Sequence, residues 1–89
     1  MNVATYDLTG KVAIITGSTR GIGKAIAETM AHYGASVVIT GRKQEACDAV
    51  ANEIKAAGGK ALGVATDVTS AEARDNLVAK TVAEFGRID

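Results

Sequence analysis

The sequence has few of the features that several classes of protein need. Its single cysteine, Cys47, excludes an internal disulfide and is typical of a reducing compartment such as the cytoplasm. Proline is absent and aromatic residues are few, so large stacking platforms are not expected. Ten basic and ten acidic residues balance to a net charge of zero, and this balance gives no indication of nucleic acid or of a charged membrane surface as a partner.

Long apolar runs and metal-ligand patterns are missing as well. No run is long enough to span a bilayer, and residues 1–7 lack the basic and apolar parts of a signal peptide. His32 is the only histidine and has no second ligand at metal spacing, so we interpret it as a surface residue and expect no metal site. A chain of 89 residues forms one small domain of marginal stability.

The sequence does contain an alternation of strand and helix patterns, without a linker. Strands are expected at residues 11–16, 36–40 and 60–66, and helices at 21–33, 44–57 and 69–85. Such an alternation predicts an α/β fold with a parallel sheet of order 3-2-1, one half of a doubly wound sheet. The first two helices are expected on one face of the sheet and the third on the other.

Apolar residues at helical spacing predict which side of each helix is buried. The stripes are Ile22, Ala25, Ile26, Thr29, Met30 and Tyr33 in the first helix, Cys47, Val50, Ala51 and Ile54 in the second, and Val78, Val82 and Phe85 in the third. Gly34 and Gly86 are expected to end the first and third helices, and Thr69 with Glu72 fits a capping box at the start of the third.

The most specific segment is the run TGSTRGIG at residues 16–23, between the first strand and the first helix. This arrangement is typical of a site for a nucleotide pyrophosphate. Its glycines let the backbone turn tightly and approach the phosphates, and the helix N-terminus presents free N–H groups. A P-loop is excluded, because Ser18 stands where that motif has glycine and Ala25 where it has Ser or Thr.

The glycine spacing, T-G-x-x-x-G-x-G, resembles that of the short-chain dehydrogenase/reductase family. Three further segments resemble that family: 8–12 its approach to the first strand, 67–69 its third-strand exit and 85–89 its approach to the fourth strand. The resemblance implies a Rossmann fold, a parent that is a homo-oligomer, and transfer of hydride between a nicotinamide cofactor and a carbonyl or alcohol.

The residues that carry the family's chemistry have no match in this sequence. The family has an Asn-Asn-Ala-Gly segment on its fourth strand, then a catalytic Ser and a Tyr-x-x-x-Lys pair, whereas neither Tyr6 nor Tyr33 is followed four positions later by lysine. We therefore assign no catalytic residue and leave open whether this chain is an enzyme. We expect residues 1–89 to be the N-terminal dinucleotide-binding portion of a Rossmann domain, truncated before the fourth strand. The first strand would then be an apolar edge through which the isolated chain self-associates.

The end of the second strand predicts which dinucleotide binds. An NAD site usually places an acid there for the ribose 2′-hydroxyl, whereas this sequence has Gly41 followed by Arg42 and Lys43. Together with Arg20 in the glycine loop, these residues resemble the NADP-preferring members of the family. The predicted cofactor-binding residues are Gly17, Ser18, Arg20, Gly21, Ile22, Gly23, Arg42, Asp67 and Val68.

Alternatives remain at this point. Arg20 and Arg42 could be solvated surface charges, Ser18 could cap the loop, and Asp67 could be a polar strand end, although its matched position in the family accepts a hydrogen bond from the adenine amino group. The chain could also be a stand-alone nucleotide-binding or interaction module that pairs through its open edge. A flavin domain is a third option, against which the glycine spacing argues.

Overall fold

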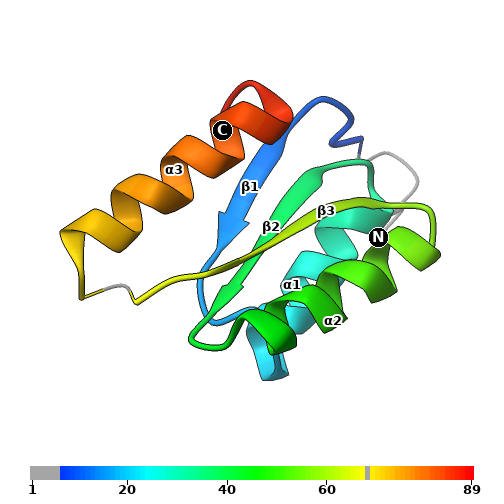
Figure 1. The fold of residues 1–89 in the computed structure, drawn as a ribbon. Helices are drawn as coiled ribbons and strands as arrows, with labels where there is room; N and C mark the ends of the chain where they lie inside the picture. The colour runs from blue at the N-terminus through cyan, green and yellow to red at the C-terminus, as the bar shows by residue number, and fades with distance from the viewer. Residues whose placement is uncertain (1–6, 68) are drawn as a thin grey trace.

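The computed structural model describes residues 7–67 and 69–89, in which strands and helices alternate along the chain. The elements are β1 Val12–Ile15, α1 Gly21–His32, β2 Ser36–Gly41, α2 Gln44–Ala56, β3 Lys60–Ala65 and α3 Ala71–Phe85 (Figure 1). The expected α/β alternation is confirmed, and no boundary differs from its predicted position by more than two residues.

The three strands form one parallel sheet with β2 in the centre. The strand order is β1-β2-β3, so the predicted order 3-2-1 is confirmed. Ile14 lies opposite Val38, and Val38 lies opposite Leu62. Because both faces of a parallel sheet are covered by helices, its central strand is apolar at consecutive positions, and Val37, Val38 and Ile39 are all buried.

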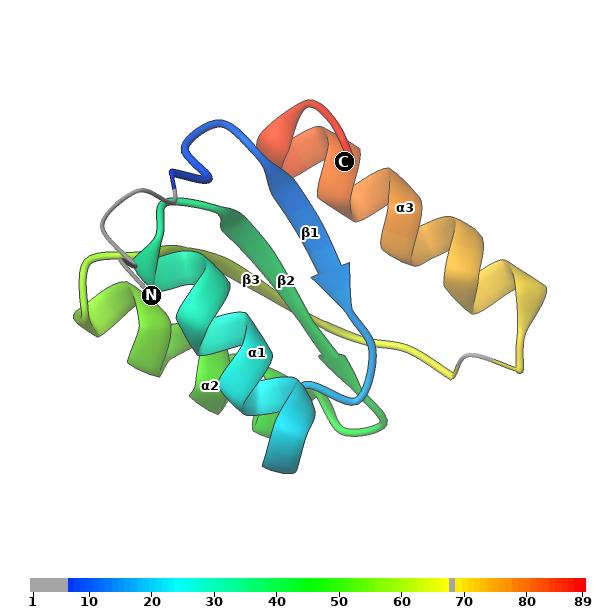
Figure 2. The same ribbon diagram turned by 180° about the vertical axis from the view of Figure 1, so that it is seen from behind.

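Helices cover both faces of the sheet, as expected. Figures 1 and 2 show α1 and α2 on one face and α3 on the other. Val37 and Ile39 pack with buried residues of the first two helices, while Val38 and Val64 pack with Leu77 of α3. The predicted buried side of α2 is confirmed in full; it consists of Cys47, Val50, Ala51 and Ile54.

The predicted buried side of α1 is largely wrong. Ile22 is 81% exposed and Ile26 is 46% exposed, whereas the buried residues of α1 are Ala27 and Ala31. Small side chains let this helix lie close to the sheet, and a pattern that gives most weight to large residues misses them. The isoleucine side of α1 therefore lies outside the core.

The predicted stripe of α3 is wrong in a similar way. Val78 and Val82 are 47% and 44% exposed, while Leu77 and Thr81 are buried. The buried hydroxyl of Thr81 is satisfied, because it donates a hydrogen bond to the Leu77 carbonyl at 2.8 Å. Only Phe85 of the predicted stripe packs against the core.

The predicted cap of α3 is displaced by one residue. Ser70, not Thr69, is the N-cap, and its hydroxyl oxygen accepts a hydrogen bond from the Ala73 N–H at 3.2 Å. The Thr69 hydroxyl instead donates to the Asp67 carboxylate at 2.6 Å. The predicted helix ends are confirmed, since Gly34 and Gly86 both have left-handed backbones, with φ of 103° and 81°.

Candidate functional site: the glycine loop and the strand ends

The glycine loop joins the end of β1 to the start of α1 and has a left-handed backbone at two positions. Gly17 and Gly21 have φ of 63° and 64°, which L side chains rarely adopt. A Cβ atom at either residue would have no neighbour within 4 Å, so open space lies directly against this backbone. The loop therefore fits a pyrophosphate, which needs close approach to the main chain.

The third glycine of the motif is required for a different reason. A Cβ atom on Gly23 would lie 2.5 Å from the carbonyl oxygen of Gly17, which is backbone and cannot rotate away. The first turn of α1 is therefore packed against the loop. This contact fixes the direction in which the helix N-terminus points.

The N-terminus of α1 can bind an anion. Arg20 precedes the helix with an extended backbone and provides no side-chain cap, and the first turn contains no acidic residue. The Lys24 N–H donates to the Arg20 carbonyl, so the N–H groups before it have no partner within the helix. The Ile22 side chain is exposed, and its contact with a cofactor stays a prediction. Free N–H groups and the helix dipole together favour a phosphate here.

Ser18 ties the ends of β1 and β2 together. Its side chain is buried, its hydroxyl donates to the Ile15 carbonyl at 2.6 Å, and its oxygen accepts from the Thr40 N–H at 2.9 Å. The Ser18 N–H also donates to the Thr40 carbonyl. This geometry matches the loop-capping interpretation of Ser18, and its contact with a cofactor stays a prediction.

Gly41, at the end of β2, is held close to the glycine loop. A Cβ atom there would lie 2.9 Å from the Thr19 methyl carbon. An acid at this position would therefore have to displace Thr19. The sequence shows that Gly41 is not acidic but does not predict this contact with Thr19, because no local pattern indicates which loop residue meets a strand end.

Two guanidinium groups and one carboxylate surround the strand ends. Arg20 and Arg42 are exposed, and neither forms an ion pair within residues 7–67 and 69–89. The Thr69 hydroxyl and N–H both donate to Asp67 and lower the pKa of its carboxyl, with a smaller contribution from the charge of Arg42. Arg42 and Asp67 therefore lie at the same end of the sheet. Val68 lies outside the described residues.

Of the other chemically active side chains, Cys47 adjoins the backbone of Gly41, whereas His32 lies at the C-terminal end of α1. Cys47 is buried, and burial raises the pKa of its thiol, which suits packing better than nucleophilic chemistry. His32 is exposed and stacks edge-on against Tyr33, with ring centroids 5.2 Å apart. The described segments contain no group of His, Cys, Asp and Glu side chains that could hold a metal ion.

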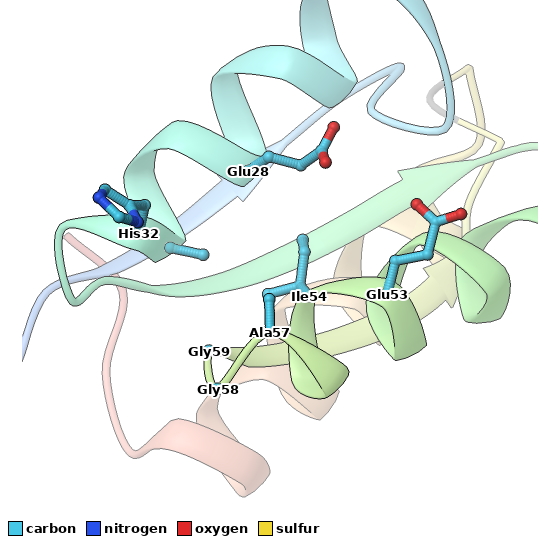
Figure 3. Close-up of a pocket in the computed structure, with 8 residues that line it drawn as sticks. Glu28, His32, Glu53, Ile54, Ala57, Gly58 and Gly59 are labelled. Atoms are coloured by element: carbon cyan, nitrogen blue, oxygen red, sulfur yellow. The ribbon is translucent and has the colours of Figure 1, made fainter.

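A hollow of about 280 Å³ lies between α1 and α2, at the opposite end of the sheet from the glycine loop. Figure 3 shows Glu28 and His32 on one side and Glu53 and Ile54 on the other, with Gly58 and Gly59 below. The C-terminal ends of both helices lie at this hollow, whereas the glycine loop adjoins the N-terminus of α1. It is therefore not part of the dinucleotide site.

Residues 11–89 match the short chain dehydrogenase family. The chain belongs to this family. Among curated family members, it is 48% identical over 82 residues to a short-chain dehydrogenase/reductase (SDRA) of Arabidopsis thaliana, which covers 92% of this chain and 32% of that protein. It is also 48% identical over 80 residues to tropinone reductase-like 3 of Erythroxylum coca, with coverage of 90% and 31%.

Solved structures of short-chain dehydrogenases have the same fold. A hydroxysteroid dehydrogenase from Escherichia coli superposes with a TM-score of 0.90 at 41% identity, covering 93% of this chain and 34% of that one. A metagenomic short-chain oxidoreductase in complex with NADP superposes with a TM-score of 0.85 at 44% identity, with coverage of 92% and 37%. The chain spans about a third of the length of the relatives it matches. In the described part of the chain, no helix is both long and apolar enough to cross a membrane.

Proposed function

We propose that this chain is the NADP(H)-binding N-terminal part of an oxidoreductase that transfers hydride between NADP(H) and a carbonyl or alcohol substrate. The observation that carries the proposal is the open backbone at Gly17 and Gly21, next to a helix N-terminus that lacks a cap and acidic neighbours. Membership of the short chain dehydrogenase family supports it, as does the similarity to a structure in complex with NADP.

The chain's own residues would bind and orient the cofactor. Backbone N–H groups of residues 21–23 would bind the pyrophosphate, and Arg20 and Arg42 would bind the 2′-phosphate. Asp67 would accept a hydrogen bond from the adenine amino group, with Val68 beside it. The nicotinamide supplies or accepts the hydride when the cofactor is bound. No residue of this chain is assigned to proton transfer.

Charge favours NADP over NAD at this site. Arg20 and Arg42 have no ion pair in the described parts of the chain, so binding a 2′-phosphate breaks no existing ion pair. A charge-assisted hydrogen bond contributes about 1.5–3 kcal/mol. One such bond corresponds to a preference of roughly tenfold or more.

Titration calorimetry with NADPH and NADH tests the preference. The chain should bind NADPH more tightly, Arg42→Ala should lose most of the difference, and Arg42→Asp should reverse it by adding repulsion. Lys55→Ala, which removes an exposed charge near the far end of α2, is the matched control and should keep the preference. Equal affinities in the unmodified chain would refute the charge argument.

A second candidate function is a non-catalytic interaction module, which the outer edge of β1 favours. Asp89 covers part of this edge, because its N–H donates to the Val12 carbonyl and its carboxylate accepts from the Val12 N–H. Ile14, two residues further along, presents its backbone groups on the same side. We propose that the isolated chain self-associates there, and that the parent is a homo-oligomer in a reducing compartment such as the cytoplasm. Binding of NADPH distinguishes the two functions, since a pure interaction module would bind none.

A further inference from the structure

The outer edge of β3 presents backbone groups that could pair with another strand. The Thr66 N–H donates inward to the Gly41 carbonyl of β2. Because the direction of backbone groups alternates along a strand, the carbonyl of Gly63 and the N–H of Ala65 point outward. Such an edge can accept a strand from another molecule unless something covers it.

The side chain of Gln44, at the start of α2, covers this edge. Its Nε2 donates to the Gly63 carbonyl at 2.8 Å, and its Oε1 accepts from the Ala65 N–H at 2.9 Å. In a parallel pair, a residue donates to the carbonyl before its neighbour and accepts from the N–H after it. Gln44 therefore provides, across Val64, the same two hydrogen bonds that a residue of an adjoining strand would make.

Asp48 holds the amide of Gln44 in this orientation. The same Nε2 donates to the Asp48 carboxylate at 2.8 Å, one turn along α2. The carboxylate also overhangs the edge, since a Cβ atom on Gly63 would lie 2.8 Å from its Oδ1. A charged group beside an edge strand opposes the approach of another backbone.

The two edges of the sheet therefore differ in the groups that cover their backbone. On β1, Asp89 bonds both backbone groups of Val12, and no side-chain amide covers Ile14 in the described parts of the chain. On β3, a side-chain amide occupies the C-terminal half of the edge.

We propose that Gln44, positioned by Asp48, closes the outer edge of β3 to strand addition by a second copy of the chain, so that strands add to the sheet only at β1. This role does not depend on cofactor binding, and its test contains no nucleotide. A chain that binds no cofactor would therefore not contradict this proposal. Likewise, variants whose self-association is unchanged would not contradict cofactor binding.

The test compares the self-association of variants by sedimentation velocity over a range of concentrations. Gln44→Ala frees the Gly63 carbonyl and the Ala65 N–H, and its association constant should rise on the order of tenfold, because two backbone hydrogen bonds become available between copies. Asn52→Ala is the matched control, since Asn52 is also an exposed amide on α2 but makes no such contact with β3. Its association should equal that of the unmodified chain.

Hydrogen exchange then locates the new contact. In the Gln44→Ala associate, the outward-facing amides of Ala61, Gly63 and Ala65 should gain protection, whereas in the unmodified chain any protection gained on association should lie on β1. Gln44→Asn is a second variant, whose side chain is one methylene too short to reach the two backbone groups; it should behave like Gln44→Ala and keeps the test valid if the alanine variant unfolds. Unchanged association in both variants, or new protection on β1 alone, would overturn the proposal.

Discussion

At the scale of single residues, the glycine motif combines two separate physical requirements. Gly17 and Gly21 are needed for a left-handed backbone and for the open space beside it, whereas Gly23 is needed because the Gly17 carbonyl lies where its side chain would be. The sequence spacing indicates all three glycines, but it does not show that Gly23 is required for a different reason from the other two. That reason depends on how the first turn of α1 packs back against the loop, which is a tertiary contact.

Gly23→Ala should destabilise the chain. In an ordinary helix, replacing glycine by alanine stabilises by up to about 1 kcal/mol. Here the new Cβ atom would meet a backbone oxygen at 2.5 Å. The overlap has to be relieved by moving the loop, which costs about 1–3 kcal/mol. Urea denaturation measures the difference, and a variant more stable than the parent chain would show that the contact is not as close as described.

Gly17→Val and Gly21→Val should abolish cofactor binding. A branched side chain would fill the open space that the pyrophosphate needs, and it would strain a backbone with positive φ. Calorimetric titration with NADPH measures binding, and circular dichroism recorded on the same samples shows whether each variant is folded. A folded variant that still binds NADPH would mean that this loop does not hold the phosphates.

At the scale of elements, the sequence predicts where helices and strands lie better than it predicts which helix face is buried. The buried side of α2 is predicted correctly because its larger apolar residues, Cys47, Val50 and Ile54, all lie on the side that meets the sheet. In α1, the isoleucines lie on one side, but the small residues Ala27 and Ala31 are the buried ones. In α3, large apolar residues occur on more than one side, and Leu77 and Thr81 are buried. Which side meets the sheet depends on close approach and on hydrogen bonds such as that of Thr81, and periodicity does not show either.

The start of α3 offers a matched pair of variants. Ser70→Ala removes the hydroxyl that caps the helix and should lower stability by about 1 kcal/mol. Thr69→Ala leaves the cap intact but removes the hydroxyl that donates to Asp67, so it should change stability less and raise the pKa of the Asp67 carboxyl. Thermal unfolding measures the first effect and NMR titration the second. A larger loss of stability from Thr69→Ala than from Ser70→Ala would indicate that Thr69 caps α3, as the sequence predicts.

At the scale of the whole molecule, the structure is one half of a doubly wound sheet with unequal edges. Gln44 covers β3, and Asp89 bonds β1 only at Val12. The side of α1 that carries Ile22 and Ile26 is exposed, as are Val78 and Val82 of α3. Exposed apolar residues on both helical layers favour association. The sequence predicts the open β1 edge from strand order, but it does not predict the role of Gln44, which depends on where α2 crosses β3.

The 89-residue chain should show no carbonyl reductase activity and should self-associate. It contains no Tyr-x-x-x-Lys pair, so proton transfer to a carbonyl oxygen has no donor of the kind that its family uses. Association should involve the β1 edge, where the backbone groups of Ile14 face outward. NADPH oxidation with a panel of ketones measures the reductase activity. Light scattering, with hydrogen exchange at Ile14, measures the self-association. Turnover by material verified as the 89-residue chain would contradict this prediction. A chain that stays monomeric at high concentration would contradict the open edge, whereas extension by a further strand and helix should remove the association by covering β1.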